Sequence, residues 1–214
     1  MAAIRIGSVL LLMLAVLPFG LYSLLRGAAL GTPDEVASRL FHEDALAPTA
    51  ALYLHMVAGG ALSILAPLQL LGAVRRRWPA IHRGTGRVTL GLAGITGLGG
   101  LIYIGALGTI GGLWMSFGFA LYGALVIAVA WATWRSAVDR SPTHPDWAAR
   151  MVVLALGSWL YRVQYGLWEL GTGGIGVRED FTGWFDRIQV LAFYLPWLMA
   201  LELWLARRRS HAFP

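Results

Sequence analysis

The sequence predicts an all-α protein: a single transmembrane domain over residues 1–214, built as a bundle of six membrane-spanning helices with both termini in the cytoplasm. Composition predicts the membrane, because 57% of the residues are hydrophobic and only 13% are charged, too few polar side chains to cover a soluble domain. The apolar residues also gather into six stretches of about 20 residues, the length that crosses the hydrocarbon core. An uneven distribution of arginine predicts the orientation.

Short connections separate the six stretches, which favours one compact bundle. We interpret the first stretch as an uncleaved span, since its apolar run is long for a signal peptide. The third stretch has Gly91, Gly94, Gly97 and Gly100 at every third position, so we expect it to pack closely against its neighbours. The predicted spans are residues 7–25, 48–74, 88–108, 114–134, 150–170 and 184–206.

Arginine gathers in every second connection. Residues 72–87, residues 135–150 and the tail from Arg207 to Arg209 are rich in it, whereas residues 27–47 hold four acidic side chains. The positive-inside rule places the arginine-rich regions in the cytoplasm. We therefore expect the partners of this chain to be the lipid bilayer and, at those arginines, anionic headgroups. The basic and aromatic pattern of a nucleic-acid binder is missing from the sequence.

The connection between the first two spans contains a helix start. Thr32 stands in the capping position, Pro33 follows at the first helical position, and Glu35 lies three residues after the cap. Apolar residues further on share one face. We predict a short amphipathic helix at about residues 33–42 that lies on the outer surface and covers the bundle.

The strongest indication of a site is a charge inside the fifth predicted span. Arg162 lies at a depth where a charge needs a partner, a water-filled cavity or a function. Ser158, Tyr165 and Glu169 share its helical face, because successive members of the set are four, three and four residues apart. At a 1.5 Å rise per residue, Arg162 also lies level with His55 of the second span, about 10–12 Å below the outer boundary. We predict an outer polar pocket, or alternatively a structural network between two helices, formed by His55, Gln69, Ser158, Arg162, Tyr165 and Glu169.

A second polar cluster is predicted at the cytoplasmic surface. It comprises His82, Arg83 and Arg87 before the third span, and His144, Trp147 and Arg150 where the fifth span begins. Thr143 with Asp146 predicts a capping box at that start. Two histidines at one membrane level are candidate ligands for haem b, here His82 and His144, and they can equally bind headgroups or cap helices.

The ordered pattern of these residues resembles a family of predicted bacterial membrane proteins, domain of unknown function 2306. The resemblance spans Tyr53 to Arg162, about half of the chain, and differs from the family at Pro145 and Ala148. It implies a multi-pass protein of the bacterial inner membrane and no established activity. The positions that match are His55, Gly59, Pro67, Gln69, His82, Arg83, Gly86, Arg87, His144, Trp147, Arg150 and Arg162.

Three functions remain open on the sequence alone. The outer pocket binds a small anion or relays protons; the chain carries electrons through haem b, resembling cytochromes b561; or it is an accessory or scaffold protein without chemistry. An enzyme is less favoured, because no Ser-His-Asp arrangement stands at a shared depth and the absence of cysteine excludes thiolate catalysis. His42 with its acidic neighbours, and His211 in the tail, lack the spacing of a helical zinc site.

Overall fold

The computed structural model describes residues 2–210, with side chains from residue 6 onward, and this part of the chain is helical without any strand. The all-α prediction is therefore confirmed. In chain order the elements are α1 (Ala2–Ala28), α2 (Pro33–Val36), η1 (Glu43–Ala45), α3 (Leu46–Leu65), η2 (Pro67–Leu70), α4 (Gly72–Arg77), α5 (Pro79–Leu107), α6 (Gly112–Val138), α7 (His144–Ala155), α8 (Gly157–Thr172), α9 (Trp184–Ala192) and α10 (Leu195–Ser210).

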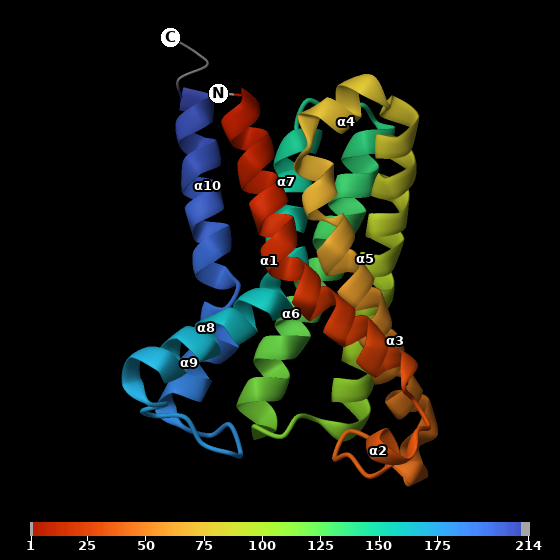
Figure 1. Cartoon of the computed structure of the whole chain (residues 1–214), viewed down its shortest axis with the longest axis vertical. Helices are drawn as coiled ribbons and strands as arrows, with labels where there is room; N and C mark the ends of the chain where they lie inside the picture. The colour runs from red at the N-terminus through yellow and green to blue at the C-terminus, as the bar shows by residue number, and fades with distance from the viewer. Residues whose placement is uncertain (1, 211–214) are drawn as a thin grey trace.

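The helices run back and forth along the long axis of the molecule (Figure 1). The start of α1, the end of α10 and α4 lie together, and we call this the arginine-rich end because α4 carries Arg75, Arg76 and Arg77. The short α2 and the loop after α8 lie at the opposite end. Within the described residues, five segments are long and apolar enough to cross a membrane: Ile6–Ala28, Glu43–Leu70, Pro79–Leu107, Gly112–Val138 and Trp184–Ser210. Such a chain has the make-up of a multi-pass membrane protein.

Close packing of α1, α3 and α5 depends on glycine. A Cβ built on Gly60 of α3 would lie 2.6 Å from the carbonyl oxygen of Gly20 on α1, and one built on Gly99 of α5 would lie 2.5 Å from that of Ala51 on α3. Those distances are too short for any side chain. Small residues let helix backbones approach in this way where packing, rather than the hydrophobic effect, drives association.

The glycines of α5 do not all pack. Gly97 faces α6, where an added Cβ would lie 2.5 Å from Cγ1 of Ile127, while Gly91 and Gly94 have open space around them. The expectation of close packing is thus confirmed for part of the stripe only. Gly99, which stands outside the every-third-residue pattern, makes one of the closest approaches.

The fifth predicted span, residues 150–170, is two helices rather than one. α7 ends deep in the core, and α8 leaves it obliquely toward the opposite end (Figure 1). At the junction, the carbonyl oxygen of Leu154 accepts a hydrogen bond from the Tyr122 hydroxyl of α6 at 2.5 Å, and that of Ala155 accepts one from Ser63 Oγ of α3 at 3.1 Å. Side chains of two other helices therefore hold the carbonyls at this break.

Glycine is also required at the junction. A Cβ built on Gly157 would lie 2.6 Å from the Tyr122 hydroxyl oxygen, so a larger residue would push that ring away from the break.

The sixth predicted span is interrupted too, between α9 and α10 at Phe193 and Tyr194. Pro196 follows there, and proline lacks the backbone N–H that a continuous helix would need. Phe193 packs edge-on against Tyr122 with ring centroids 4.9 Å apart, so the two interruptions meet in the core.

Two further boundaries differ from the sequence prediction. α3 ends at Leu65, because Pro67 cannot donate into the helix, and the chain continues through η2 and α4. α5 begins at Pro79, at the first helical position that proline favours, so the predicted connection of residues 72–87 forms α4 and the first turns of α5. The outer helix is also shorter than predicted.

That outer helix, α2, covers four residues instead of about residues 33–42. Thr32 precedes it, but its side chain makes no capping hydrogen bond, and Thr143 makes none at the start of α7. The Glu35 carboxylate, expected to complete a capping box, contacts α1 and α3 instead. The tertiary partners of Glu35 therefore displaced the local pairing that the sequence predicted.

Candidate functional site

His55 is held between α3 and α5. Its Nδ1 lies 2.6 Å from the carbonyl oxygen of Thr96, and a carbonyl only accepts, so Nδ1 is the donor. Gly99 and Gly100 make room for the ring, since a Cβ on Gly100 would lie 3.1 Å from Nδ1. This predicted site residue thus links two helices through a backbone carbonyl.

Arg162 lies on α8 and faces α1. Its Nη1 donates to the carbonyl oxygen of Ser158 at 3.1 Å, and its Cζ lies 4.7 Å from the ring centroid of Phe19. Tyr22 and Arg26 follow Phe19 on the same face of α1 and act on Arg162 electrostatically. No described carboxylate forms an ion pair with Arg162. The guanidinium therefore keeps an unneutralised charge, and its side chain is exposed at the surface of the bundle.

Arg162 and His55 are neighbours but not partners. Arg162 lies near enough to act electrostatically on His55, although no hydrogen bond joins them. Ser158 takes part through its backbone carbonyl. Gln69 lies elsewhere, because its Nε2 donates to Oγ1 of Thr85 at 2.9 Å near the arginine-rich end. The six predicted pocket residues are therefore divided among several places.

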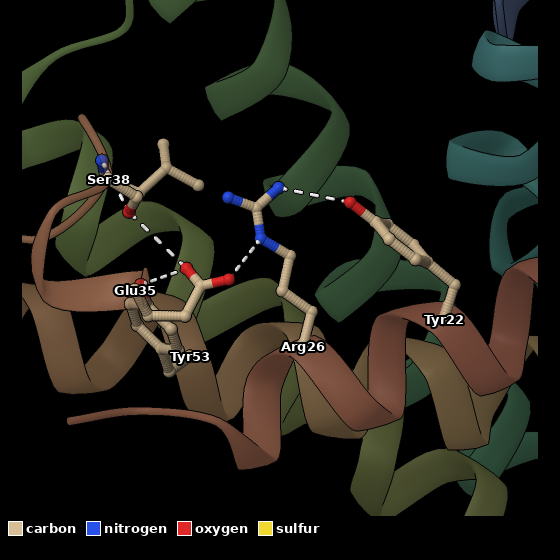
Figure 2. Close-up of polar contacts among 6 residues, drawn as sticks. Tyr22, Arg26, Glu35, Ser38 and Tyr53 are labelled. Carbon is tan, nitrogen blue, oxygen red and sulfur yellow. Dashed lines mark hydrogen bonds and ion pairs between the residues drawn. The ribbon is translucent and has the colours of Figure 1, made fainter. Parts of the chain in front are cut away.

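A carboxylate clamp joins α1, α2 and α3 beside Arg162. Glu35 accepts hydrogen bonds from Arg26 Nε at 3.0 Å, from the Tyr53 hydroxyl at 2.6 Å and from Ser38 Oγ at 3.4 Å (Figure 2). Arg26 also donates from Nη1 to the Tyr22 hydroxyl at 3.3 Å. The bond from Tyr53, with the ion pair to Arg26, holds the pKa of Glu35 below its ordinary value. Arg26 is thereby neutralised, whereas Arg162 is not.

Tyr165 and Glu169 contribute to a different feature, at the opposite end. The Tyr165 hydroxyl donates to Oδ1 of Asp186 at 2.7 Å, and Oδ2 of that buried carboxylate accepts from the backbone N–H of Gly183 at 2.9 Å and of Arg178 at 3.0 Å. Asp186 therefore ties α8 and the loop after it to α9. Tyr165 and Glu169 also line a shallow depression of about 580 Å³, together with Arg39, Gly173, Gly174, Val177, Arg178, Glu179 and Phe181.

The predicted cytoplasmic cluster forms two groups at the arginine-rich end. In the first, Arg150 of α7 forms a bidentate ion pair with Glu202 of α10, in which Nη2 lies 2.8 Å from Oε2. The Cζ atom of Arg150 also lies 4.6 Å from the Trp147 ring centroid. His144 begins α7 and contacts α6, with Nδ1 at 3.3 Å from the carbonyl oxygen of Thr133 and 3.2 Å from Ser136 Oγ. These contacts fasten α7 to α6 and α10.

The second group lies on the first turns of α5 and comprises His82, Arg83 and Arg87, the arginines being exposed. His82 and His144 are close enough to interact electrostatically. Within the part of the chain that the structure describes, no three His, Cys, Asp or Glu side chains gather as metal ligands. His211 lies outside the described residues. Haem ligation by His82 and His144 stays a prediction.

Three residues of these networks escaped the sequence reasoning: Glu35 as an ion-pair partner, Asp186 and Glu202. A usable signal existed for Glu202, because an acidic residue inside an apolar stretch needs a partner for the same reason as Arg162 does. The chain matches no protein-family profile, no curated protein and no solved structure. The resemblance to domain of unknown function 2306 therefore stays a prediction from the motif.

Proposed function

We propose that this chain crosses a bacterial inner membrane six times, with α7 and α8 together forming one interrupted crossing and the arginine-rich end in the cytoplasm. The support is the alternation of the chain between the two ends of the bundle (Figure 1) and the gathering of arginine at one of them. Arginine is retained on the cytoplasmic side during insertion. Broken helices are tolerated at membrane depth where other helices satisfy the freed backbone, as Tyr122 and Ser63 do here.

We further propose that the protein binds a small anionic group at Arg162, between α1 and α8. The observation that carries this proposal is the unneutralised guanidinium beside Phe19, at a position about nine residues, or ~13 Å, along α1 from its Ala28 end. An unpaired charge in an apolar surrounding is expensive. A carboxylate or phosphate oxygen would offset that cost.

The donors around Arg162 suit such a ligand. The guanidinium has five N–H groups, and its described hydrogen bond uses one of them, on Ser158. The remaining donors can form the parallel pair that a carboxylate or a phosphate accepts. Tyr22, whose side chain is exposed, stands one turn further along α1. Arg26 beyond it is paired with Glu35, so Arg162 carries the positive charge that is left for a ligand.

The test is anion-dependent stability of the purified protein in a neutral detergent. Acetate and succinate are titrated at constant ionic strength while the melting temperature is followed by tryptophan fluorescence. Binding to the folded state at ten times the dissociation constant stabilises it by about 1.4 kcal/mol. We expect the wild type to gain stability with at least one anion, and Arg162→Gln to lose that response.

Arg39→Gln is the matched control. Arg39 is an exposed arginine at the end of the bundle opposite the arginine-rich end, and the described cation–π contact of Phe19 is with Arg162. It should respond to the anion as the wild type does. Equal stabilisation of the wild type and Arg162→Gln would refute the anion site. Failure of every anion to stabilise the wild type would refute it as well.

A further inference from the structure

His82 has one ring nitrogen that is fully buried and one that is not. Its Nδ1 is buried and has no hydrogen-bond partner in the described structure, whereas Nε2 makes no described hydrogen bond and is not fully buried. A buried lone pair without a partner costs less than a buried N–H without one. The proton of the neutral ring is therefore assigned to Nε2, which leaves an accessible donor without a described partner.

The charged groups that act on the His82 ring are all basic. Arg75, Arg83 and His144 act on His82 electrostatically, and no carboxylate does. They come from three elements: Arg75 from α4, Arg83 from α5 and His144 from α7. Both arginines are exposed, and neither forms an ion pair with a described residue. The cluster thus concentrates donors and positive charge without internal neutralisation.

Local structure places α4, which carries Arg75, beside the start of α5, which carries His82. α4 ends at Arg77, the chain turns at Trp78 with φ −133° and ψ 67°, and Pro79 starts α5, so that His82 lies on its first turn. The Trp78 ring is exposed, a position typical of aromatic residues at the level of lipid headgroups. The cluster is therefore expected where phosphate groups of the bilayer lie.

We propose that Arg75, His82 and Arg83 bind a phosphate group at the arginine-rich end. A phosphate offers several acceptor oxygens that point in different directions, which matches one imidazole and two guanidinium donors arriving from α4 and α5. Phosphate of an anionic lipid and free phosphate share this chemistry. The site is independent of Arg162, which lies toward the other end on α8.

The experiment compares Arg75→Ala with Arg76→Ala, two adjacent exposed arginines whose removal changes the net charge equally, and of which only Arg75 acts on His82. Each protein, in neutral detergent, is titrated in one arm with inorganic phosphate and in the other with phosphatidylglycerol, with melting temperature as the readout. Sodium chloride of the same ionic strength serves as the blank. The arm that stabilises the wild type identifies the source of the phosphate.

We expect Arg75→Ala to weaken the stabilising ligand about tenfold or more, because a charge-assisted hydrogen bond is lost, and Arg76→Ala to stay within about twofold of the wild type. In an Arg162→Gln background, which removes the anion site on α8, Arg75→Ala and Arg76→Ala should still differ in the same way, which separates the two sites. An equal loss in Arg75→Ala and Arg76→Ala would mean general surface charge and would overturn the proposal. No stabilisation of the wild type in either arm would overturn it too.

Discussion

Replacing Tyr53 by phenylalanine tests the carboxylate clamp with a minimal change. The Tyr53 side chain is almost fully buried, and its hydroxyl donates to Glu35 at 2.6 Å, so Tyr53→Phe removes one charge-assisted hydrogen bond and keeps the ring. Such a bond contributes about 1.5–3 kcal/mol. With a slope of about 2–4 °C per kcal/mol for a chain of this size, the melting temperature should fall by about 3–12 °C.

The pH dependence makes this prediction specific. The fold lowers the pKa of Glu35, so the stabilisation is fully present above the ordinary carboxyl value of about 4.3 and is lost as the pH falls through the lowered folded value. The difference between wild type and Tyr53→Phe should therefore be constant near neutrality and narrow in acid. Melting is followed by tryptophan fluorescence in detergent from neutral pH into this acidic window.

Tyr103→Phe is the control, because its hydroxyl makes only a long contact, 3.5 Å, with His42 Nε2. It should leave the melting temperature within the error of the wild type. A Tyr53→Phe protein as stable as the wild type, or one whose deficit stays the same or widens in acid, would refute the stabilising role of the hydrogen bond from Tyr53 to the Glu35 carboxylate.

Two further substitutions test packing and the helix break. Gly99→Ala should destabilise the protein by about 1–3 kcal/mol, because the new methyl group would meet the Ala51 carbonyl. Gly94→Ala, at a position with open space, should leave stability unchanged. Equal melting temperatures of the two variants would contradict the close approach of α3 and α5. Tyr122→Phe removes the donor to the Leu154 carbonyl and should lower stability by about 1–3 kcal/mol; a neutral effect in a thermal melt would show that this carbonyl has another partner.

Hydropathy predicted the helices well because an apolar stretch in a membrane has few alternatives to a helix. It could not predict the break in residues 150–170. Gly157 was the one local sign, and glycine is common in continuous membrane helices. The interruption depends on Tyr122 and Ser63, which lie far away in the sequence and become visible only when the helices are packed.

The same cause limited the prediction of the site. Level depths for His55 and Arg162 were derived from straight helices, whereas α8 turns away from α7 and brings Arg162 against Phe19. The helical stripe correctly grouped residues along α8, yet each has different partners: the Tyr165 hydroxyl donates to Asp186, and Arg162 donates to a carbonyl of its own helix. Spacing within one helix reveals which residues share a face, and packing decides what that face meets.

The break between α7 and α8 also constrains how the protein is made. Its two carbonyls are satisfied by side chains of α3 and α6, so this bend is stable in lipid only after those helices are in place. A ribosome delivers the chain from the N-terminus, and both partners leave it before α7 does. The order of synthesis therefore supplies each hydrogen-bond donor before its acceptor, and moving the α7–α8 segment to the front of a permuted chain would reverse that order.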